Sequence, residues 1–120
     1  MIIINLKLIN LIMAPDYKNT KIYMIYCNDS NITDIYIGYS TNIQDRMKVH
    51  RRCCNNPANK SYSTRMYIFI RNNGGWNNWS YRIIQQPYCL SKKESEEKEY
   101  FWINFYNPSL NTNKKNNIII

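Results

Sequence analysis

The sequence predicts a small α+β domain: a β-hairpin, then helices, a third strand and a last helix. Apolar residues alternate in two neighbouring segments near the start, recur at helical spacing over residues 43–54, and resume after a helix-capping pattern near residue 91. A chain of 120 residues suits one domain with a modest core. We expect this domain at residues 20–112, with residues 1–19 an extension outside the fold and residues 113–120 a frayed tail.

The hairpin is predicted from alternation. Apolar side chains alternate along residues 22–27, and a polar stretch at residues 28–34 separates them from a second such segment at residues 35–39. Tyr23 and Tyr36 are then expected on neighbouring strands.

Two helices and a third strand are predicted next. Thr41 and Gln44 form a T-x-x-Q capping box before about three helical turns that end ahead of Pro57. Residues 61–73 read as a second helix that stops at two glycines, although residues 67–70 also suit a strand. Alternation over residues 79–83 predicts the third strand.

The last helix has the clearest boundaries. Ser91 and Glu94 form a second capping box, and the helical pattern runs to about Tyr106 and ends near Pro108. Residues 107–111 are expected to form a turn that doubles back.

The composition of the chain indicates which kind of partner and which cellular compartment to expect. Sixteen Lys and Arg against eight Asp and Glu give a net charge of +8, which favours a polyanionic partner but is weak evidence alone. The four cysteines (Cys27, Cys53, Cys54 and Cys89) contain no CxxC pair, so we expect reduced thiols in an intracellular, reducing compartment. Polar residues interrupt the apolar residues 1–13, which fall short of the ~20 that span a bilayer, so no membrane partner is expected.

Glu99 is the best metal-ligand candidate. Together with Trp102, Ile103 and Tyr106 it falls at i, i+3, i+4 and i+7, so it lies on the helix stripe that should face the core. A carboxylate there is costly unless it is paired or bound to a cation. A glutamate at the edge of the stripe that pairs with a lysine fits the periodicity equally well.

Arg46 and His50 lie one helical turn apart and should project together. The Arg46 guanidinium suits a scissile phosphate because it stays charged and matches phosphate oxygens, although a surface arginine also fits the pattern. His50 is the only histidine and suits proton transfer or phosphate contact, but a lone histidine on an apolar stripe is more often structural, so its role is secondary.

Tyrosine and asparagine are too common here for composition to select one. A tyrosine hydroxyl acts as a general base only if a neighbouring cation lowers its pKa, and the chain has eleven tyrosines. Asn111 follows the predicted turn, where its amide would hydrogen-bond back and hold a loop or a tyrosine in place.

The order of these segments resembles the GIY-YIG nuclease family. The resemblance covers residues 21–112 and rests on Lys21-Ile22-Tyr23, Tyr36-Ile37-Gly38-Tyr39-Ser40, residues 45–50, residues 97–103 and Leu110-Asn111. It implies a three-stranded antiparallel sheet flanked by helices. It also implies a site of Tyr23, Tyr36, Arg46, Glu99 and Asn111, with His50 as an accessory. Lys21 departs from the family pattern, which has glycine there.

The resemblance further implies a chemistry and a partner. It implies hydrolysis of a DNA phosphodiester with one Mg²⁺ or Mn²⁺ held by Glu99, attack by water with help from Tyr23, and Arg46 on the phosphate. Only one carboxylate is central, which disfavours a two-metal mechanism. No appended DNA-binding module is visible, so we expect low sequence specificity or a separate targeting protein.

Two other functions compete with the nuclease. An inactive nuclease-like fold that only binds nucleic acid would use the net charge of +8 equally well, but it has no need for Glu99. An interaction protein would use Trp76, Trp79 and Tyr81 as exposed contacts, although these aromatics are better explained as core residues of a strand.

Overall fold

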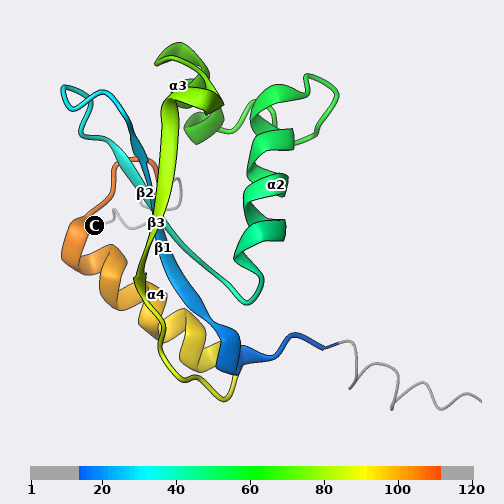
Figure 1. Cartoon of the computed structure of the whole chain (residues 1–120), viewed down its shortest axis with the longest axis vertical. Coiled ribbons are helices and arrows are strands. Elements are labelled where there is room, and N and C mark those ends of the chain that lie inside the picture. The colour runs from blue at the N-terminus through cyan, green and yellow to red at the C-terminus, as the bar shows by residue number, and fades with distance from the viewer. Residues whose placement is uncertain (1–13, 112–120) are drawn as a thin grey trace, which may run out of the picture.

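The computed structural model describes residues 14–111, which form one three-stranded antiparallel sheet with helices on both faces (Figure 1). The strand order is β2-β1-β3, with β1 at Lys21–Cys27, β2 at Ile35–Ser40 and β3 at Trp79–Gln85. The α+β fold and all three predicted strands are confirmed.

The central strand β1 is buried on both faces, so its alternating side chains serve two cores. Ile22 and Met24 face one side, whereas Tyr23 and Ile25 face the other. In the β1–β2 hairpin Tyr23 pairs with Gly38 and Ile25 with Tyr36. Between Ile22 and Tyr23 the pairing with β3 shifts by one residue, and such bulges re-aim neighbouring side chains. Lys21 starts the strand without a positive φ angle.

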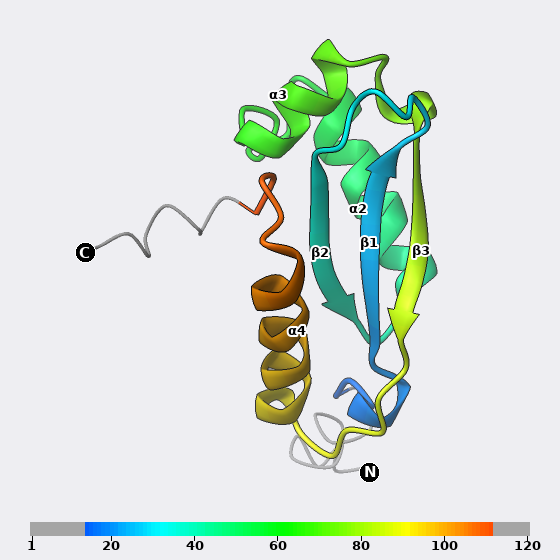
Figure 2. The ribbon, with the colours of Figure 1, turned by 90° about the vertical axis from the view of Figure 1, so that its left-hand side faces the viewer.

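Each sheet face is covered by different helices, as Figures 1 and 2 show from two directions. Helix α4 (Lys92–Tyr106) packs Trp102, Ile103 and Tyr106 against Ile22, Met24 and Ile37. Helices α2 (Ile43–Asn55) and α3 (Arg65–Asn72) cover the opposite face around Tyr23 and Ile25. The apolar stripe predicted on the last helix therefore does face the core.

The helix starts differ in part from their predictions. Asn42, not Thr41, caps α2: its side chain accepts a hydrogen bond from the Asp45 amide and donates one to the Asp45 carboxylate. Asn is a better N-cap than Thr, so the cap lies one residue later than predicted. Helix α3 begins at Arg65 rather than Ser61, and residues 67–70 are helical, not β.

The start and end of α4 agree with their predictions. Ser91 accepts from the Glu94 amide, and Glu94 accepts from the Leu90 amide. Asn107 ends the helix with φ 48°, a left-handed conformation that asparagine tolerates, and Pro108 follows. The chain then doubles back, because the Leu110 amide donates to the Ile35 carbonyl.

The three aromatic residues considered as contacts of an interaction protein differ in burial. Trp79 is buried in the core and Trp76 is half-buried, but Tyr81 is 41% exposed on β3. The prediction that Tyr81 is a core residue was therefore wrong, because β3 is an edge strand with one face partly open.

The structure describes only part of the predicted N-terminal extension and none of the predicted tail. Residues 1–13 and 112–120, which include most of the predicted extension and the tail at 113–120, lie outside the described residues. Residues 17–19 form a short 3₁₀ turn, and Thr20 is buried with its hydroxyl 2.6 Å from that of Ser95 on α4. None of the helices within residues 14–111 is long and apolar enough to cross a bilayer.

Candidate functional site

The Tyr23 hydroxyl is the centre of the candidate site. Its side chain is fully buried between the sheet and α2, and its oxygen lies 2.8 Å from His50 Nε2 and 3.4 Å from Arg46 Nε. Burial and the neighbouring Tyr36 raise the pKa of Tyr23, and Arg46 lowers it by less. Tyr23 is therefore a neutral phenol in the free protein, where Arg46 alone does not bring its pKa below the ordinary value.

Gly38 makes room for this tyrosine. It pairs with Tyr23 across the hairpin, and a Cβ at this position would lie 2.7 Å from the Tyr23 hydroxyl oxygen and 2.9 Å from the Tyr36 ring. Distances this short are repulsive, so any side chain at this position would displace a tyrosine. The glycine of the Tyr36-Ile37-Gly38 segment thus serves packing of the site.

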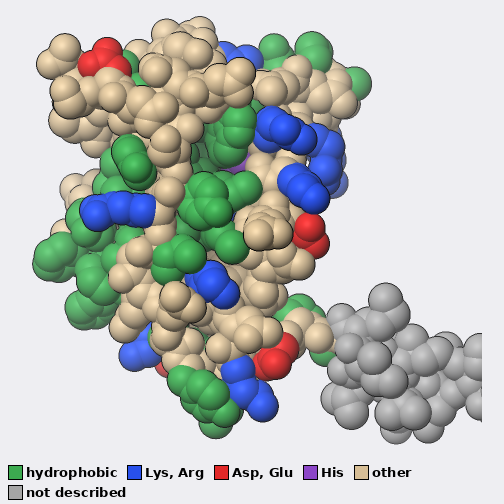
Figure 3. All heavy atoms as spheres, viewed as in Figure 1, with side chains coloured by type: hydrophobic (Ala, Val, Ile, Leu, Met, Phe, Trp, Pro, Cys, Tyr) green, Lys and Arg blue, Asp and Glu red, His purple; other side chains and the backbone are tan. Residues whose placement is uncertain are grey.

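Arg46 and His50 reach Tyr23 from successive turns of α2, as their spacing predicts. Burial lowers the pKa of Arg46, but Tyr23 and Tyr36 raise it by more, so the guanidinium stays charged. Arg46 lies on a helix that also carries Lys48, Arg51 and Arg52, and Figure 3 shows Lys and Arg side chains gathered on the α2 side of the molecule. A fixed positive charge therefore adjoins the Tyr23 hydroxyl.

His50 is fully buried and uses both ring nitrogens. Nε2 meets the Tyr23 hydroxyl, and Nδ1 lies 2.7 Å from the Tyr67 hydroxyl. Burial and the charge of Arg46 lower the pKa of His50 to about 3. His50 is thus neutral at physiological pH, with one proton-free nitrogen. Its position satisfies the structural interpretation as well as the secondary catalytic one.

Tyr36 stands beside this cluster on β2. Its ring centroid lies 6.2 Å from that of Tyr23 and 5.6 Å from that of His50, which it meets edge-on. Burial raises the pKa of Tyr36, Arg46 lowers it and the Glu99 carboxylate raises it. Tyr36 therefore adjoins both the Arg46 guanidinium and the Glu99 carboxylate.

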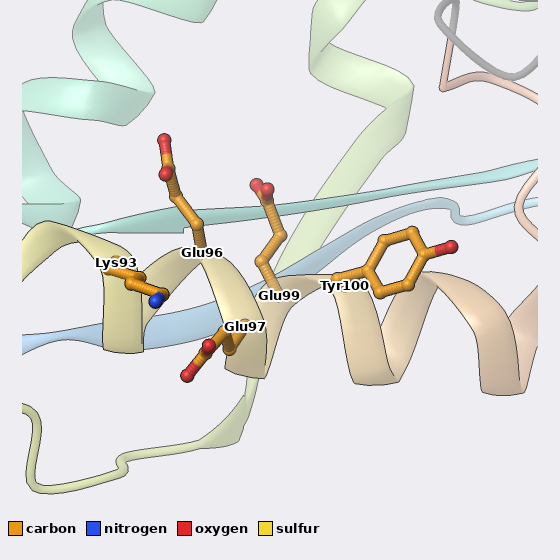
Figure 4. A pocket seen from close by; sticks show the side chains of 5 residues that line it. All are labelled: Lys93, Glu96, Glu97, Glu99 and Tyr100. Carbon is orange, nitrogen blue, oxygen red and sulfur yellow. The ribbon is translucent and has the colours of Figure 1, made fainter.

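Glu99 is half-buried on α4, at the β2 edge of the sheet. It lines an open hollow of about 410 Å³ with four other α4 side chains, and Figure 4 shows Glu96 and Glu99 extending together over β2. Burial raises the pKa of Glu99 to about 7; a backbone hydrogen bond at Tyr39 and the charge of Arg46 lower it, and Glu96 raises it. Within the described part of the chain, Glu99 forms no ion pair with a lysine. The alternative in which Glu99 is an edge glutamate paired with a lysine therefore does not apply there.

These properties fit a hard divalent cation. A half-buried carboxylate with a raised pKa gains most from a bound cation, and oxygen is the ligand that Mg²⁺ and Mn²⁺ prefer. Within residues 14–111 no three His, Cys, Asp or Glu side chains gather to hold a metal. Glu99, with Glu96 beside it, would thus supply one or two ligands and leave the others to water or substrate, as is usual for Mg²⁺.

Asn111 is committed to the edge of β2. Its buried amide accepts from the Ile37 N–H at 2.9 Å and donates to the Ile37 carbonyl at 2.8 Å. This pairing imitates a neighbouring strand and fixes the segment between Tyr36 and Gly38. Asn111 is thereby placed to hold a tyrosine in position, with its amide occupied by the backbone.

Three further residues join the site that the sequence did not single out for it. Tyr67 on α3 contacts His50; Trp76 stacks on the His50 ring with centroids 6.1 Å apart and planes at 23°; and Glu96 extends beside Glu99. Helical spacing relates Glu96 to Glu99 at i and i+3 and was available as a signal. Tyr67 and Trp76 gave none, because their contacts depend on how separate elements pack.

Comparison with known proteins gives one match. A family model described as the GIY-YIG catalytic domain matches residues 19–116, which include all six candidate residues. No curated protein and no solved structure gave a significant match to the chain.

Proposed function

The chain belongs to the GIY-YIG catalytic-domain family, and on that premise we propose that it is a DNA endonuclease that hydrolyses phosphodiester bonds with one divalent metal ion. The observation that carries the proposal is the convergence of Arg46, His50 and Tyr23 at one hydroxyl, with the Glu99 carboxylate at the adjoining edge of β2.

Arg46 would hold the scissile phosphate. Its Nε contacts Tyr23, and guanidinium groups bind phosphate oxygens through paired donors and stabilise the charge that develops in the transition state. A phosphate bound there would also offset the positive charge that lowers the pKa of His50. Substrate binding would therefore make His50 a better proton acceptor.

Tyr23 would transfer a proton rather than act as a preformed phenolate. Its raised pKa keeps the phenol neutral, so it can take a proton from the attacking water only as it gives its own to His50 Nε2. The water oxygen bonds to phosphorus and the phosphorus–oxygen ester bond breaks. Glu99 would hold the divalent ion, with Mg²⁺ or Mn²⁺ as the candidates, which would supply positive charge for the phosphate and for the leaving oxygen; that oxygen would take its proton from solvent.

Tyr67 would orient His50 for this transfer. Arg46 can only donate to Tyr23, so we assign a one-way chain in which Tyr23 O–H donates to Nε2 and Nδ1–H donates to the Tyr67 oxygen. The Tyr67 hydroxyl in turn lies against the Cys53 thiol. This direction leaves Nε2 free to receive the phenolic proton.

The surface charge and the cysteines support a partner and a compartment. Exposed cations on α2 favour DNA, and a separate protein would supply any sequence specificity. Cys27, Cys53, Cys54 and Cys89 are all buried free thiols, which suits an intracellular, reducing compartment.

The decisive experiment is cleavage of supercoiled plasmid by the wild type and Glu99→Gln with Mg²⁺, with Mn²⁺ and with chelator, beside a DNA-binding assay. We expect metal-dependent nicking by the wild type and loss of nicking with retained binding in the variant. Exposed Glu97, whose side chain extends the other way in Figure 4, gives the matched control Glu97→Gln, which should nick normally. Binding without nicking under every condition would overturn the proposal in favour of an inactive nucleic-acid-binding protein.

A further inference from the structure

A groove beside the candidate site has a composition that the proposed reaction does not use. Met47, Lys48 and Arg51 from α2 and Trp76 from the short η2 turn (Trp76–Asn78) enclose about 180 Å³. Its floor is aromatic and thioether, and its rim carries two cations. From this groove we infer a nucleotide-binding subsite for DNA in which the base next to the cleaved phosphodiester is unpaired; the inference rests on the proposed function.

Trp76 connects this groove to the reacting groups. Its indole stacks on His50, whose ring is hydrogen-bonded to the Tyr23 hydroxyl, and Trp76 itself is only half-buried. The indole that lines the groove is thus separated from the Tyr23 hydroxyl by one imidazole ring. In the sequence Met47 directly follows Arg46, and Arg51 directly follows His50. One stretch of DNA strand would therefore contact both the groove and the candidate site.

The two cations are free to bind phosphate. Lys48 and Arg51 are exposed and project from adjacent turns, and within residues 14–111 neither side chain has a hydrogen bond or an ion pair. The acidic residue of α2, Asp45, is instead engaged with the cap residue Asn42. A phosphate on either side of a base in the groove would therefore meet an uncompensated positive charge.

The apolar floor decides between paired and unpaired DNA. A paired base keeps both faces against its neighbours in the duplex, so only its backbone would meet this groove. An unpaired base exposes its flat faces, and stacking on an indole is favourable for every base. Met47 adds a polarizable contact of the kind that packs well against rings. The groove should therefore favour single-stranded or mismatched DNA over perfect duplex.

Binding measured in chelator tests the subsite without requiring cleavage. We would measure anisotropy of the full chain with fluorescein-labelled perfect duplex, the same duplex with one unpaired base, and single strand. We expect about tenfold tighter binding to the unpaired forms, which corresponds to the lower range of stacking on one aromatic. Trp76→Leu should abolish this preference and Trp76→Phe should keep most of it.

The cations should act differently from the indole. Lys48→Gln with Arg51→Gln should weaken every DNA and lower the slope of log affinity against log salt by roughly 1.4 to 1.8. Arg82→Gln with Lys92→Gln removes the same charges from exposed positions on β3 and α4 and should leave the preference for unpaired DNA unchanged.

Each contrary result has a distinct meaning. Equal binding of paired and unpaired DNA by the wild type, or a preference that survives in folded Trp76→Leu, would overturn the subsite. If Trp76→Leu fails to fold, Trp76→Phe and 2-aminopurine at the unpaired position decide, because stacking on Trp76 must quench that base. Cleavage without a preference would reject the subsite alone, whereas preferential binding without cleavage would reject the nuclease alone.

Discussion

The two halves of the candidate site differ in how much freedom their groups have. On the α2 side, Tyr23 and His50 are fully buried and hydrogen-bonded to each other, to Arg46 and to Tyr67. On the α4 side, Glu99 is half-buried at the rim of an open hollow. One half is a closed hydrogen-bond chain, and the other is an accessible carboxylate.

This difference separates two kinds of chemistry. Burial keeps Tyr23 and His50 neutral, so the closed half can pass a proton along fixed bonds but does not titrate near neutral pH. Burial together with Glu96 brings the pKa of Glu99 to about 7, so the open half changes its charge in that range. In the proposed reaction, proton transfer and cation binding thus belong to groups on different elements, α2 with β1 for the first and α4 for the second, which meet beside Tyr36 on β2.

The largest effect on cleavage should come from removing a group of the buried hydrogen-bond chain on the α2 side. Tyr23→Phe removes the hydroxyl that meets Arg46 and His50, and Arg46→Ala removes the charge beside it. We expect each to lower kcat roughly 10² to 10⁴-fold with little change in DNA affinity, the usual range for an acid-base or electrostatic group. Single-turnover cleavage beside anisotropy would measure both. Parallel losses of rate and affinity would mark them as binding groups instead.

Gly38 should show how tightly the closed half is packed. Gly38→Ala places a methyl group 2.7 Å from the Tyr23 oxygen, so we expect it to lower the free energy of unfolding by roughly 1–3 kcal/mol, as overpacked cores do, and to reduce cleavage. Denaturant unfolding gives the first quantity. In a Tyr23→Leu background the collision with the Tyr23 ring is gone and the one with the Tyr36 ring remains, so the same change should be milder there. An equal loss in both backgrounds would mean that Tyr36 or the strand backbone, and not Tyr23, requires glycine.

The affinity of the open half, at Glu99, for a cation should depend on pH. Protonated Glu99 cannot bind a cation, so Mn²⁺ affinity should fall about tenfold per pH unit well below pH 7 and be constant above it. Titration of Mn²⁺ between pH 5.5 and 8.5 would measure this. Glu96→Gln should move the transition to lower pH because Glu96 raises the pKa of Glu99. A transition unchanged in Glu99→Gln would assign the metal to another group.

The same carboxylate links pH to stability. Glu99 is protonated more in the folded chain than in the unfolded chain, whose ordinary pKa is 4.5. Stability therefore falls as pH rises from about 4.5 to 7, because the folded state binds more protons in this window, and the penalty is fully present above pH 7. A bound cation would relieve it.

Local sequence pattern was sufficient for the framework of both halves. Alternation placed Tyr23 and Tyr36 on paired strands, and helical spacing placed Arg46 and His50 on one side of α2. The capping pattern at Ser91 located α4 and with it Glu99. These features depend on neighbours within a few residues, which is why the sequence carries them.

Properties that depend on packing between elements were not accessible in this way. Tyr67 reaches His50 only because α3 lies against α2, and the stack of Trp76 on that ring depends on η2. The charge state of Tyr23 likewise follows from complete burial, which alternation does not measure. The displaced cap at Asn42 shows a smaller gap: adjacent residues with similar propensities were separated only by the turn that formed.

The smallest expected effect would test the direction of the closed chain. Tyr67→Phe removes the partner of His50 Nδ1, so His50 should lose its single tautomer and cleavage should fall about five- to tenfold, a smaller loss than removal of Tyr23 itself because Tyr67 lies one bond further away. Nitrogen-15 NMR of the wild type should find the proton on Nδ1, and both tautomers in the variant. Tyr62, whose ring packs on Arg71, offers Tyr62→Phe as a control that should change neither quantity. A wild-type proton on Nε2 would reverse the chain: Tyr67 would then donate to His50, and Nε2 would be unavailable to receive the Tyr23 proton.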